Sequence, residues 1–409
     1  MGLIINIDEA IRLRSEYNIL NESLTAMLKD KQEQWEKKNP IDLLFVRGSI
    51  DTFQETYTSN IGFAHAFQET SDYAVAPIYN TEEGFAATYR TRTFQGGFKI
   101  TQQVIEDKRY GKARDNASSF MKRWHGDIVE YCMTAMSAGF GKSVEWGDSN
   151  GHTSTIKLTS ADTVDGTLDA AKNPLFSKAH TIVKRRGMTD EEVTVAHQSN
   201  LFYIPVDLAG DDMAKMTKLA DGINQVITIM ENYKDDNNKF VAMDGAFDIV
   251  TANDALLKSS LNTVLSMPMY NDFGQMLGKN PAYQRANYDY TSYLNAIPQC
   301  ANGRGFFIVN KGYNAENHGL ELTERVPLTM NVEITKNPYG ISYDGRQRFD
   351  VNNASWRGIA YVYIGTPAGA SGDWDDVTKY TKITPSATVV KEVRVVNTTT
   401  APVNTKTVS

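Results

Sequence analysis

The chain has 409 residues, of which 41% are hydrophobic and 22% charged, so at roughly 100 to 200 residues per domain it can hold more than one packed unit and is not a wholly disordered protein. Its net charge of −7 excludes a general affinity for nucleic-acid phosphates, and any DNA contact must be local. The two cysteines, Cys132 and Cys300, lie far apart and indicate neither a disulfide framework nor a zinc knuckle. A reducing compartment fits best.

The amino-terminal stretch MGLIINIDEAIRLRSEY lacks the basic start and unbroken apolar core of a secretory signal. No apolar run reaches the ~18 residues that a membrane-spanning helix needs. We therefore expect a soluble protein, made in the cytoplasm, with no membrane partner.

The first predicted element is a long charged helix over residues 8–38, which ends at Asn39 and Pro40. Its apolar positions recur at steps of three and four and form one stripe: Leu13, Tyr17, Leu20, Leu24 and Met27. That stripe needs a partner. An ordinary packed helix is one interpretation, and an arm lying along a neighbouring subunit is the other.

Residues 61–98 are rich in Thr, Tyr and Phe, and the stretch FAATYRTRTF alternates after turn signals at Pro77 and Asn80. The pattern predicts a long β-hairpin with too few apolar positions for a core of its own. Such a hairpin must pack against another surface to be stable. Opposite charges and an aromatic ring make five of its residues candidates for contacts between subunits: Glu82, Glu83, Arg90, Arg92 and Phe94. Solvated surface charge is the alternative.

The strongest helical pattern covers residues 103–139. Its apolar stripe steps by three and four through Ala113, Ala117, Phe120, Trp124, Ile128, Tyr131 and Ala135. A helix of about nine turns is far longer than average and can span a whole subunit.

The remaining chain mixes both element types. Helices are predicted over residues 211–233 and after residue 253, and strands at 247–251 and within 304–366. The fold class is therefore α+β. Beyond residue 367 the composition turns to Gly, Ser, Thr and Val. There we expect a mobile end, and residues 383–396 alternate enough to form an added strand.

The stretch NPLFSKAHTIVK, residues 173–184, sets Ser177 three residues before His180, as a nucleophile and its base could be placed on a helix. Catalysis also needs an orienting acid and oxyanion donors, and no Gly-x-Ser-x-Gly elbow occurs. A structural role for both residues is favoured.

Two further motifs are incomplete. GFGKS, residues 139–143, lacks the first glycine of a phosphate-binding loop, since Met136 stands there, and a helix-ending glycine is the simpler interpretation. KDDNNKF, residues 234–240, has Phe240 where a calcium loop needs glycine, and it predicts a polar turn. The histidines show no HxxxH or HExxH spacing. We expect no metal, no cofactor and no enzyme.

Taken in chain order, the hairpin, the long helix, NPLFSKAHTIVK, FDIVTANDALLKSSLNTVL, GRGFFIVN and EITKNPYGISYDGRQRFDV resemble the major capsid proteins of tailed bacteriophages, from residue 61 to about residue 366. The LFSxxH stretch looks like that of capsid proteins of the phage Mu type. The resemblance implies the capsid fold of the phage Hong Kong 97. Its expected parts are an N-terminal arm with a helix (1–60), an extended loop (61–98), a peripheral domain (99–241 and 334–366) with a spine helix (103–139), an axial domain (242–333) and a C-terminal extension (367–409).

The resemblance also implies a function. The chain would assemble as pentamers and hexamers into the icosahedral head shell of a virion, built in the host cytoplasm, and would enclose double-stranded DNA without reading its sequence. A separate scaffolding protein and a portal would be its partners, with a decoration protein as a further candidate. An encapsulin-like nanocompartment is the alternative with the same fold. A hydrolase using Ser177 and His180, or a monomeric binding module, would be a different class.

Overall fold

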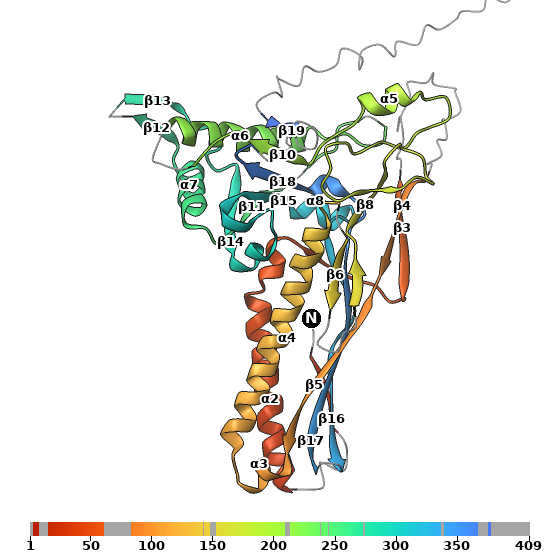
Figure 1. The fold of residues 1–409 in the computed structure, drawn as a ribbon, viewed down its shortest axis with the longest axis vertical. Coiled ribbons are helices and arrows are strands. Elements are labelled where there is room, and N and C mark those ends of the chain that lie inside the picture. The colour runs from red at the N-terminus through yellow and green to blue at the C-terminus, as the bar shows by residue number, and fades with distance from the viewer. Residues whose placement is uncertain are drawn as a thin grey trace, which may run out of the picture.

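The computed structural model describes most of the chain, namely residues 3–7, 15–60, 83–141, 143–147, 153–208, 213–237, 239–243, 245–272, 275–336, 339–366 and 375–377. These residues form two large sheets, two long helices and several short hairpins (Figure 1). Helices and strands alternate irregularly along the chain, so the predicted α+β class is confirmed.

The long sheet forms the lower part of the molecule in Figure 1. Its strand order is β1 (Ile4–Ile7), β16 (Glu321–Lys336), β17 (Tyr339–Asn352) and β5 (Arg92–Thr101), and β2 (Val46–Ser49) also pairs with β16. Burial alternates along β17, with Ile341 and Tyr343 buried and Asp344 and Arg346 exposed. This period of two gives the sheet one apolar and one polar face.

The helices α2 (Ser15–Lys37) and α4 (Tyr110–Ala138) lie side by side on the apolar face of the long sheet (Figure 1). Leu20, Leu24 and Leu28 are buried there at a spacing of four. Because this stripe is covered by the same subunit, the packing agrees with the interpretation of α2 as an ordinary packed helix, and a contact of its outer face with a neighbouring subunit stays a prediction. Leu13 lies outside the described residues.

The long predicted helix is divided in two. The short helix α3 (Gln102–Glu106) ends before α4 begins, and Lys108 between them has a left-handed backbone with φ of 53°. The predicted stripe begins only at Ala113, so it could not reveal this break. From Ala113 onward the stripe is buried, or partly buried at Phe120 and Trp124, first against the long sheet and then, from Ile128, against a second core.

The predicted hairpin has different boundaries. Strand β3 (Gln54–Asn60) pairs antiparallel with β4 (Glu83–Arg90), and the chain then passes through Thr91 into β5 of the long sheet. FAATYRTRTF is thus two strands in two sheets, and the hairpin begins before residue 61. Residues 61–82, with most of the predicted loop, lie outside the described residues.

The second large sheet lies at the upper end of α4 (Figure 1). Its strand order is β14 (Ala286–Thr291), β11 (Phe247–Ala252), β15 (Gly305–Asn310), β18 (Ile359–Ile364), β10 (Leu201–Ile204) and β19 (Asp375–Asp376). The helices α6 (Met213–Glu231) and α7 (Ala255–Ser266) pack with it. The limits predicted for the axial domain, 242–333, do not coincide with this sheet, because β10 and β18 belong to it, α6 shares its core, and β16 belongs to the long sheet.

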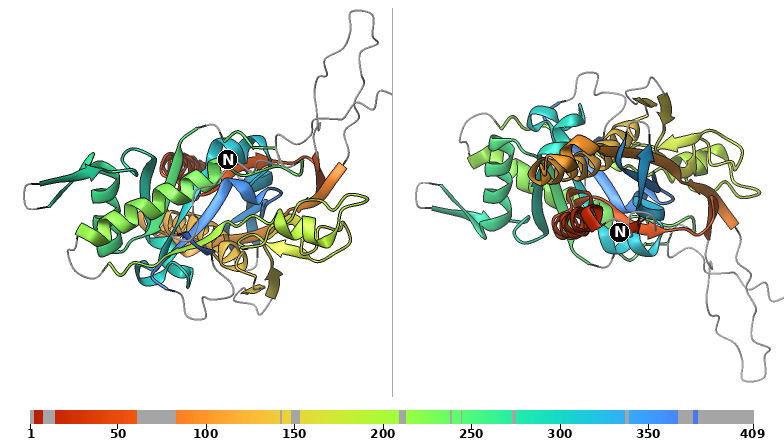
Figure 2. Two further views of the ribbon diagram at one scale, coloured as in Figure 1. Left: turned by 90° about the horizontal axis from the view of Figure 1, so that it is seen from above. Right: turned by 90° about the horizontal axis from the view of Figure 1, so that it is seen from below.

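Shorter elements complete the described chain. They are η1 (Pro40–Leu43), β6 (Val144–Gly147), β7 (Thr153–Ile156), β8 (Thr159–Thr163), β9 (Lys172–Pro174), α5 (Asp190–Val195), β12 (Met269–Asp272), β13 (Gln275–Lys279), η2 (Ser292–Ala296), η3 (Ala301–Gly303), α8 (Lys311–Glu316) and η4 (Trp356–Gly358). Figure 2 shows the β12–β13 hairpin, in teal, and the β3–β4 hairpin, in orange, projecting at opposite ends of the molecule.

Strand β19 comes from the predicted C-terminal extension. It pairs with β10 through Phe202 and Asp375, and Val377 after it is buried. The added strand predicted at 383–396 and the mobile end lie outside the described residues. Among the residues that the structure does describe, no helix is long and apolar enough to cross a membrane.

Candidate functional site at the root of the hairpin

The β3–β4 hairpin forms a sheet of its own within the described part of the chain. On β4, Phe85, Ala87 and Tyr89 are buried, while the residues between them are exposed. The buried face packs on Ala161 of β8 and on Val183. The part of the hairpin nearest the body, which we call its root, therefore packs on its own subunit. A hairpin with so little apolar surface needs such support, because two strands alone are marginally stable.

Tyrosines from both strands of the hairpin meet at His318. The hydroxyl of Tyr89 donates a hydrogen bond to the carbonyl oxygen of His318 at 2.8 Å. The ring of Tyr57 stacks on the His318 ring, with 4.0 Å between centroids, and lies 4.7 Å from the ring of Tyr89. Burial raises the pKa of Tyr89, so its hydroxyl keeps its proton and remains a donor. No local pattern in the sequence predicted this contact between the hairpin and His318.

A cavity of about 430 Å³ opens beside the hairpin root. Tyr57 and Phe85 line it from the hairpin, and Asp236, Trp356 and Arg357 line it from the body of the subunit. Aromatic rings and charged groups of both signs thus meet at the junction between the hairpin and the body.

Two of the five residues predicted to contact neighbours have partners in their own subunit. The Nε atom of Arg92 lies 3.0 Å from Oδ2 of Asp350, and the ring of Phe94 stacks on Phe349 at 4.5 Å. Both side chains are therefore engaged inside the subunit.

Two of the other three residues lie on β4. The exposed Arg90 donates a hydrogen bond from Nε to Oε1 of Gln54 on the opposite strand of the hairpin, at 3.1 Å. Glu83, the first residue of β4, lies opposite Asn60 of β3 in the strand register. Glu82 lies outside the described residues. Arg90 and Glu83 thus remain candidates for contacts with a neighbour.

The partner of Arg92 is part of a buried polar group. The hydroxyl of Tyr131 on α4 donates to Oδ1 of Asp350 at 2.6 Å. Burial raises the pKa of Asp350, and the hydrogen bond from Tyr131 and the charge of Arg92 oppose that shift. The group joins the start of β5, the end of β17 and α4, so its role is to hold the subunit together.

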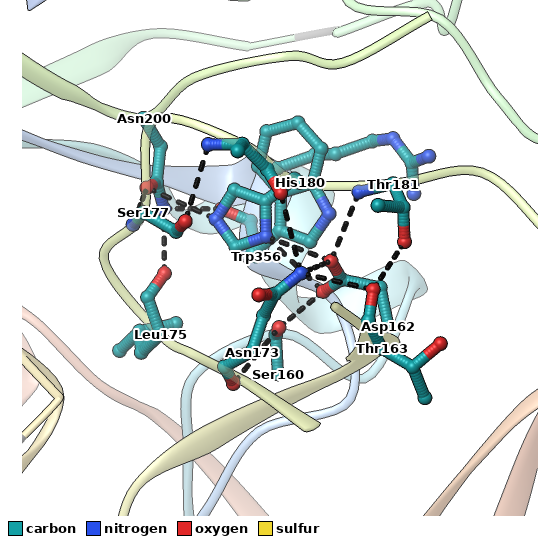
Figure 3. A network of polar contacts seen from close by, with 12 residues as sticks. Ser160, Asp162, Thr163, Asn173, Leu175, Ser177, His180, Thr181, Asn200 and Trp356 are labelled. Carbon is teal, nitrogen blue, oxygen red and sulfur yellow. Dashed lines mark hydrogen bonds and ion pairs between the residues drawn. The ribbon is translucent and has the colours of Figure 1, made fainter. Parts of the chain in front are cut away.

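Ser177 and His180 belong to a second buried network (Figure 3). The His180 side chain has no exposed surface, and its Nδ1 lies 3.1 and 3.2 Å from the two carboxylate oxygens of Asp162. Its Nε2 lies 3.1 Å from Oδ1 of Asn200. The hydroxyl of Ser177 accepts the amide hydrogen of Ala179 instead. With both ring nitrogens engaged, His180 is not placed as a base for Ser177.

The same network ties distant segments together. Asp162 accepts hydrogen bonds from Nδ2 of Asn173 at 2.6 Å and from the amide of Thr181 at 3.1 Å. Burial acts to raise the Asp162 pKa, but the charge and hydrogen bond of His180, with hydrogen bonds from Ser160 and Asn173, lower it overall. The structural role favoured for Ser177 and His180 agrees with these contacts.

The two incomplete motifs also have structural explanations. Gly139 caps the end of α4, and its amide donates to the carbonyl of Ala135 at 3.2 Å. Oδ1 of Asp235 accepts the amides of Asn237 and Lys239, both at 2.8 Å, which closes a polar turn. Among the described residues, no group of three or more His, Cys, Asp or Glu side chains could hold a metal ion.

No protein-family model and no curated protein matches the chain. Among solved structures, one from Mycobacterium phage Patience matches 92% of this chain and 95% of its own, with 13% identity and a TM-score of 0.41. The mature capsid of bacteriophage PhiM1 matches 80% of this chain and 86% of its own, with 7% identity and a TM-score of 0.42. A virus-like particle from Pyrococcus furiosus matches 83% and 98%, with 9% identity and a TM-score of 0.41. The likeness is remote, so a function has to come from the geometry of this chain.

Proposed function

We propose that this chain is the subunit of a closed icosahedral shell, a major capsid protein of the tailed-phage type that encloses a double-stranded DNA genome. The observation that carries the proposal is the β3–β4 hairpin, a two-stranded sheet of its own that packs on the subunit through one face of β4 and leaves the other face of that strand exposed. An isolated ribbon of two strands is marginally stable in water, and coverage by a neighbouring subunit would stabilise it.

The division of the subunit into two ends supports the same proposal. The long sheet with α2 and α4 forms one elongated body, the proposed peripheral domain, and the six-stranded sheet forms the other, the proposed axial domain. Around a closed ring, every subunit presents the same two patches, so weak contacts repeat and add up to a strong wall. Rings of five and six such subunits close an icosahedral shell.

Charge is consistent with a container for DNA. A net charge of −7 disfavours tight binding of DNA phosphates, so the shell would enclose the genome without binding it tightly. We infer that a separate scaffolding protein guides assembly, that a portal occupies one vertex, and that a decoration protein can bind the outer surface. The assembled shell would be part of the virion.

Negative-stain electron microscopy of the purified protein tests the proposal. The sample is compared with and without a co-expressed scaffold candidate. Closed isometric shells, or rings of five and six subunits, are the expected result. Nucleic acid inside the particles indicates a phage head, whereas enzymes inside them indicate an encapsulin-like nanocompartment. Small asymmetric monomers under both conditions would overturn the shell proposal.

A further inference from the structure

His318 has a backbone conformation that few residues other than glycine adopt. Its φ is +48°, in the left-handed region that glycine adopts freely and that other residues enter at a cost. It follows α8, where a helix often ends in such a residue, and glycine is usual at that position. A glycine does occur in this turn, at position 319, but the left-handed position itself holds a histidine.

The carbonyl oxygen of His318 accepts hydrogen bonds from three donors. It accepts the Tyr89 hydroxyl at 2.8 Å, the amide of Ala354 at 2.9 Å and the amide of Ser355 at 3.2 Å. The left-handed turn therefore presents one carbonyl both to the hairpin and to the segment before η4. A glycine could do this as well, so the carbonyl alone does not explain the histidine.

The imidazole ring supplies what a glycine cannot. It stacks on Tyr57 with 4.0 Å between ring centroids and 28° between planes. Its Nδ1 lies 3.4 Å from Oε1 of Glu321, a side chain that is only 8% exposed. The ring thus contacts Glu321 of β16 through Nδ1 and Tyr57 of β3 through one of its faces.

We propose that His318 is a positioning residue that sets the direction in which the hairpin leaves the subunit. The backbone carbonyl of His318 holds β4 through Tyr89, and its ring holds β3 through Tyr57. Both strands of the hairpin are therefore fixed on one strained residue, which is where strain retained by the surrounding structure points to a function. The inference rests on the proposed shell, because only there does the hairpin's direction decide which neighbour it meets.

The test is hydrogen exchange in the unassembled full-length subunit, read at the amides of β3 and β4. His318→Asn keeps a residue that tolerates the left-handed backbone but removes the ring. Lys108→Asn is the matched control, because Lys108 has a φ of 53° and lies in the exposed turn between α3 and α4. We expect exchange in β3 and β4 to become about tenfold faster in His318→Asn and to stay unchanged in Lys108→Asn.

Tyr57→Leu removes the other half of the stack and should give the same local increase, which keeps the test available if His318→Asn does not fold. Unchanged hairpin exchange in both variants would overturn the positioning role. Microscopy of the same samples separates the two proposals. If the wild-type protein forms no shells, the shell proposal fails whatever the exchange shows. If wild-type shells form and His318→Asn, with a loosened hairpin, forms equally regular ones, the positioning role is overturned.

Discussion

Trp124 of α4 donates a hydrogen bond from its indole nitrogen to Oε1 of Gln347 on β17, over 2.9 Å. Gln347 makes a second hydrogen bond, in which its amide nitrogen donates to Oε1 of Glu324 on β16 at 2.9 Å. The indole also lies over the place where Gly96 of β5 pairs with Gly345 of β17. The middle of α4 is therefore joined to three strands of the long sheet.

This junction predicts the effect of two substitutions at Trp124. Trp124→Phe keeps a ring over the paired glycines but loses the hydrogen bond, so we expect a loss of about 1 kcal/mol in the free energy of unfolding. Trp124→Ala also leaves a cavity between helix and sheet, and we expect a loss of about 3 kcal/mol. Urea unfolding of the full-length subunit measures both. Equal losses in the two variants would mean that packing of the ring contributes little.

The contact between α2 and α4 predicts a dependence of stability on pH. His125 is stacked on Trp35 at 4.4 Å, and its Nε2 lies 2.9 Å from Oε1 of Gln32. Burial lowers the pKa of His125 to about 4, from an ordinary value of 6.5. Between these two values the unfolded chain binds a proton that the folded chain does not. This contribution to stability is therefore complete above pH 6.5 and is lost as the pH falls to 4.

The matched variant is His125→Phe, which keeps a ring against Trp35 and cannot titrate. Unfolding free energies of both proteins are measured from pH 7 to pH 4. The wild type should lose about 2–3 kcal/mol more than the variant across this range, since each unit of pKa shift corresponds to about 1.4 kcal/mol. Parallel curves would show that His125 is not the group responsible.

Periodicity predicted the elements whose faces are covered by neighbours in the same chain. The stripe from Ala113 to Ala135 identifies α4 because a buried helix face must repeat at 3.6 residues. The break at Lys108 could not be predicted, because a left-handed backbone at a lysine leaves no mark on an apolar pattern.

Pairings between distant segments were equally hidden. Arg92 and Asp350 are 258 residues apart, and β10 pairs with β18 through Leu201 and Tyr361. Strands of one sheet can come from any part of the chain, so sequence order separated β10 and β18 from β11, β14 and β15 of the same sheet. For the same reason the sequence could not show that Arg92, next to the hairpin, has an ion-pair partner at Asp350 in its own subunit.

Two neighbouring arginines should therefore respond differently to substitution. Arg92→Ala leaves the buried carboxylate of Asp350 without its ion pair, and we expect the isolated subunit to lose about 2–3 kcal/mol. Arg90→Ala removes an exposed side chain and should change stability by less than about 0.5 kcal/mol. Thermal or urea unfolding of unassembled subunits compares them. The assignment of Arg92 to the interior fails if the two losses are equal.

The lysine content of the hairpin region predicts how shells are held together. Some shells of this kind link their subunits through an isopeptide bond between a lysine of the extended loop and an asparagine of a neighbour. Residues 51–98 contain no lysine, so the amine for such a bond is missing from the hairpin. Purified particles should dissociate into single 45.6 kDa chains on a denaturing gel. A ladder of linked subunits would contradict a non-covalent shell.

Substitutions in the network of Figure 3 distinguish a structural role of Ser177 and His180 from a catalytic one. His180→Ala leaves the Asp162 carboxylate, which is 3% exposed, without the ring nitrogen that contacts both of its oxygens, and we expect a loss of about 3 kcal/mol. Ser177→Ala removes only the acceptor of the Ala179 amide, and about 1 kcal/mol or less should be lost. Unfolding free energies and electron microscopy of assembled particles are the measurements. A hydrolase would reverse this order of importance: Ser177→Ala would abolish an activity in a subunit that still folds and assembles. Because the ring nitrogens of His180 face Asp162 and Asn200, we expect Ser177→Ala particles to match the wild type in form and number.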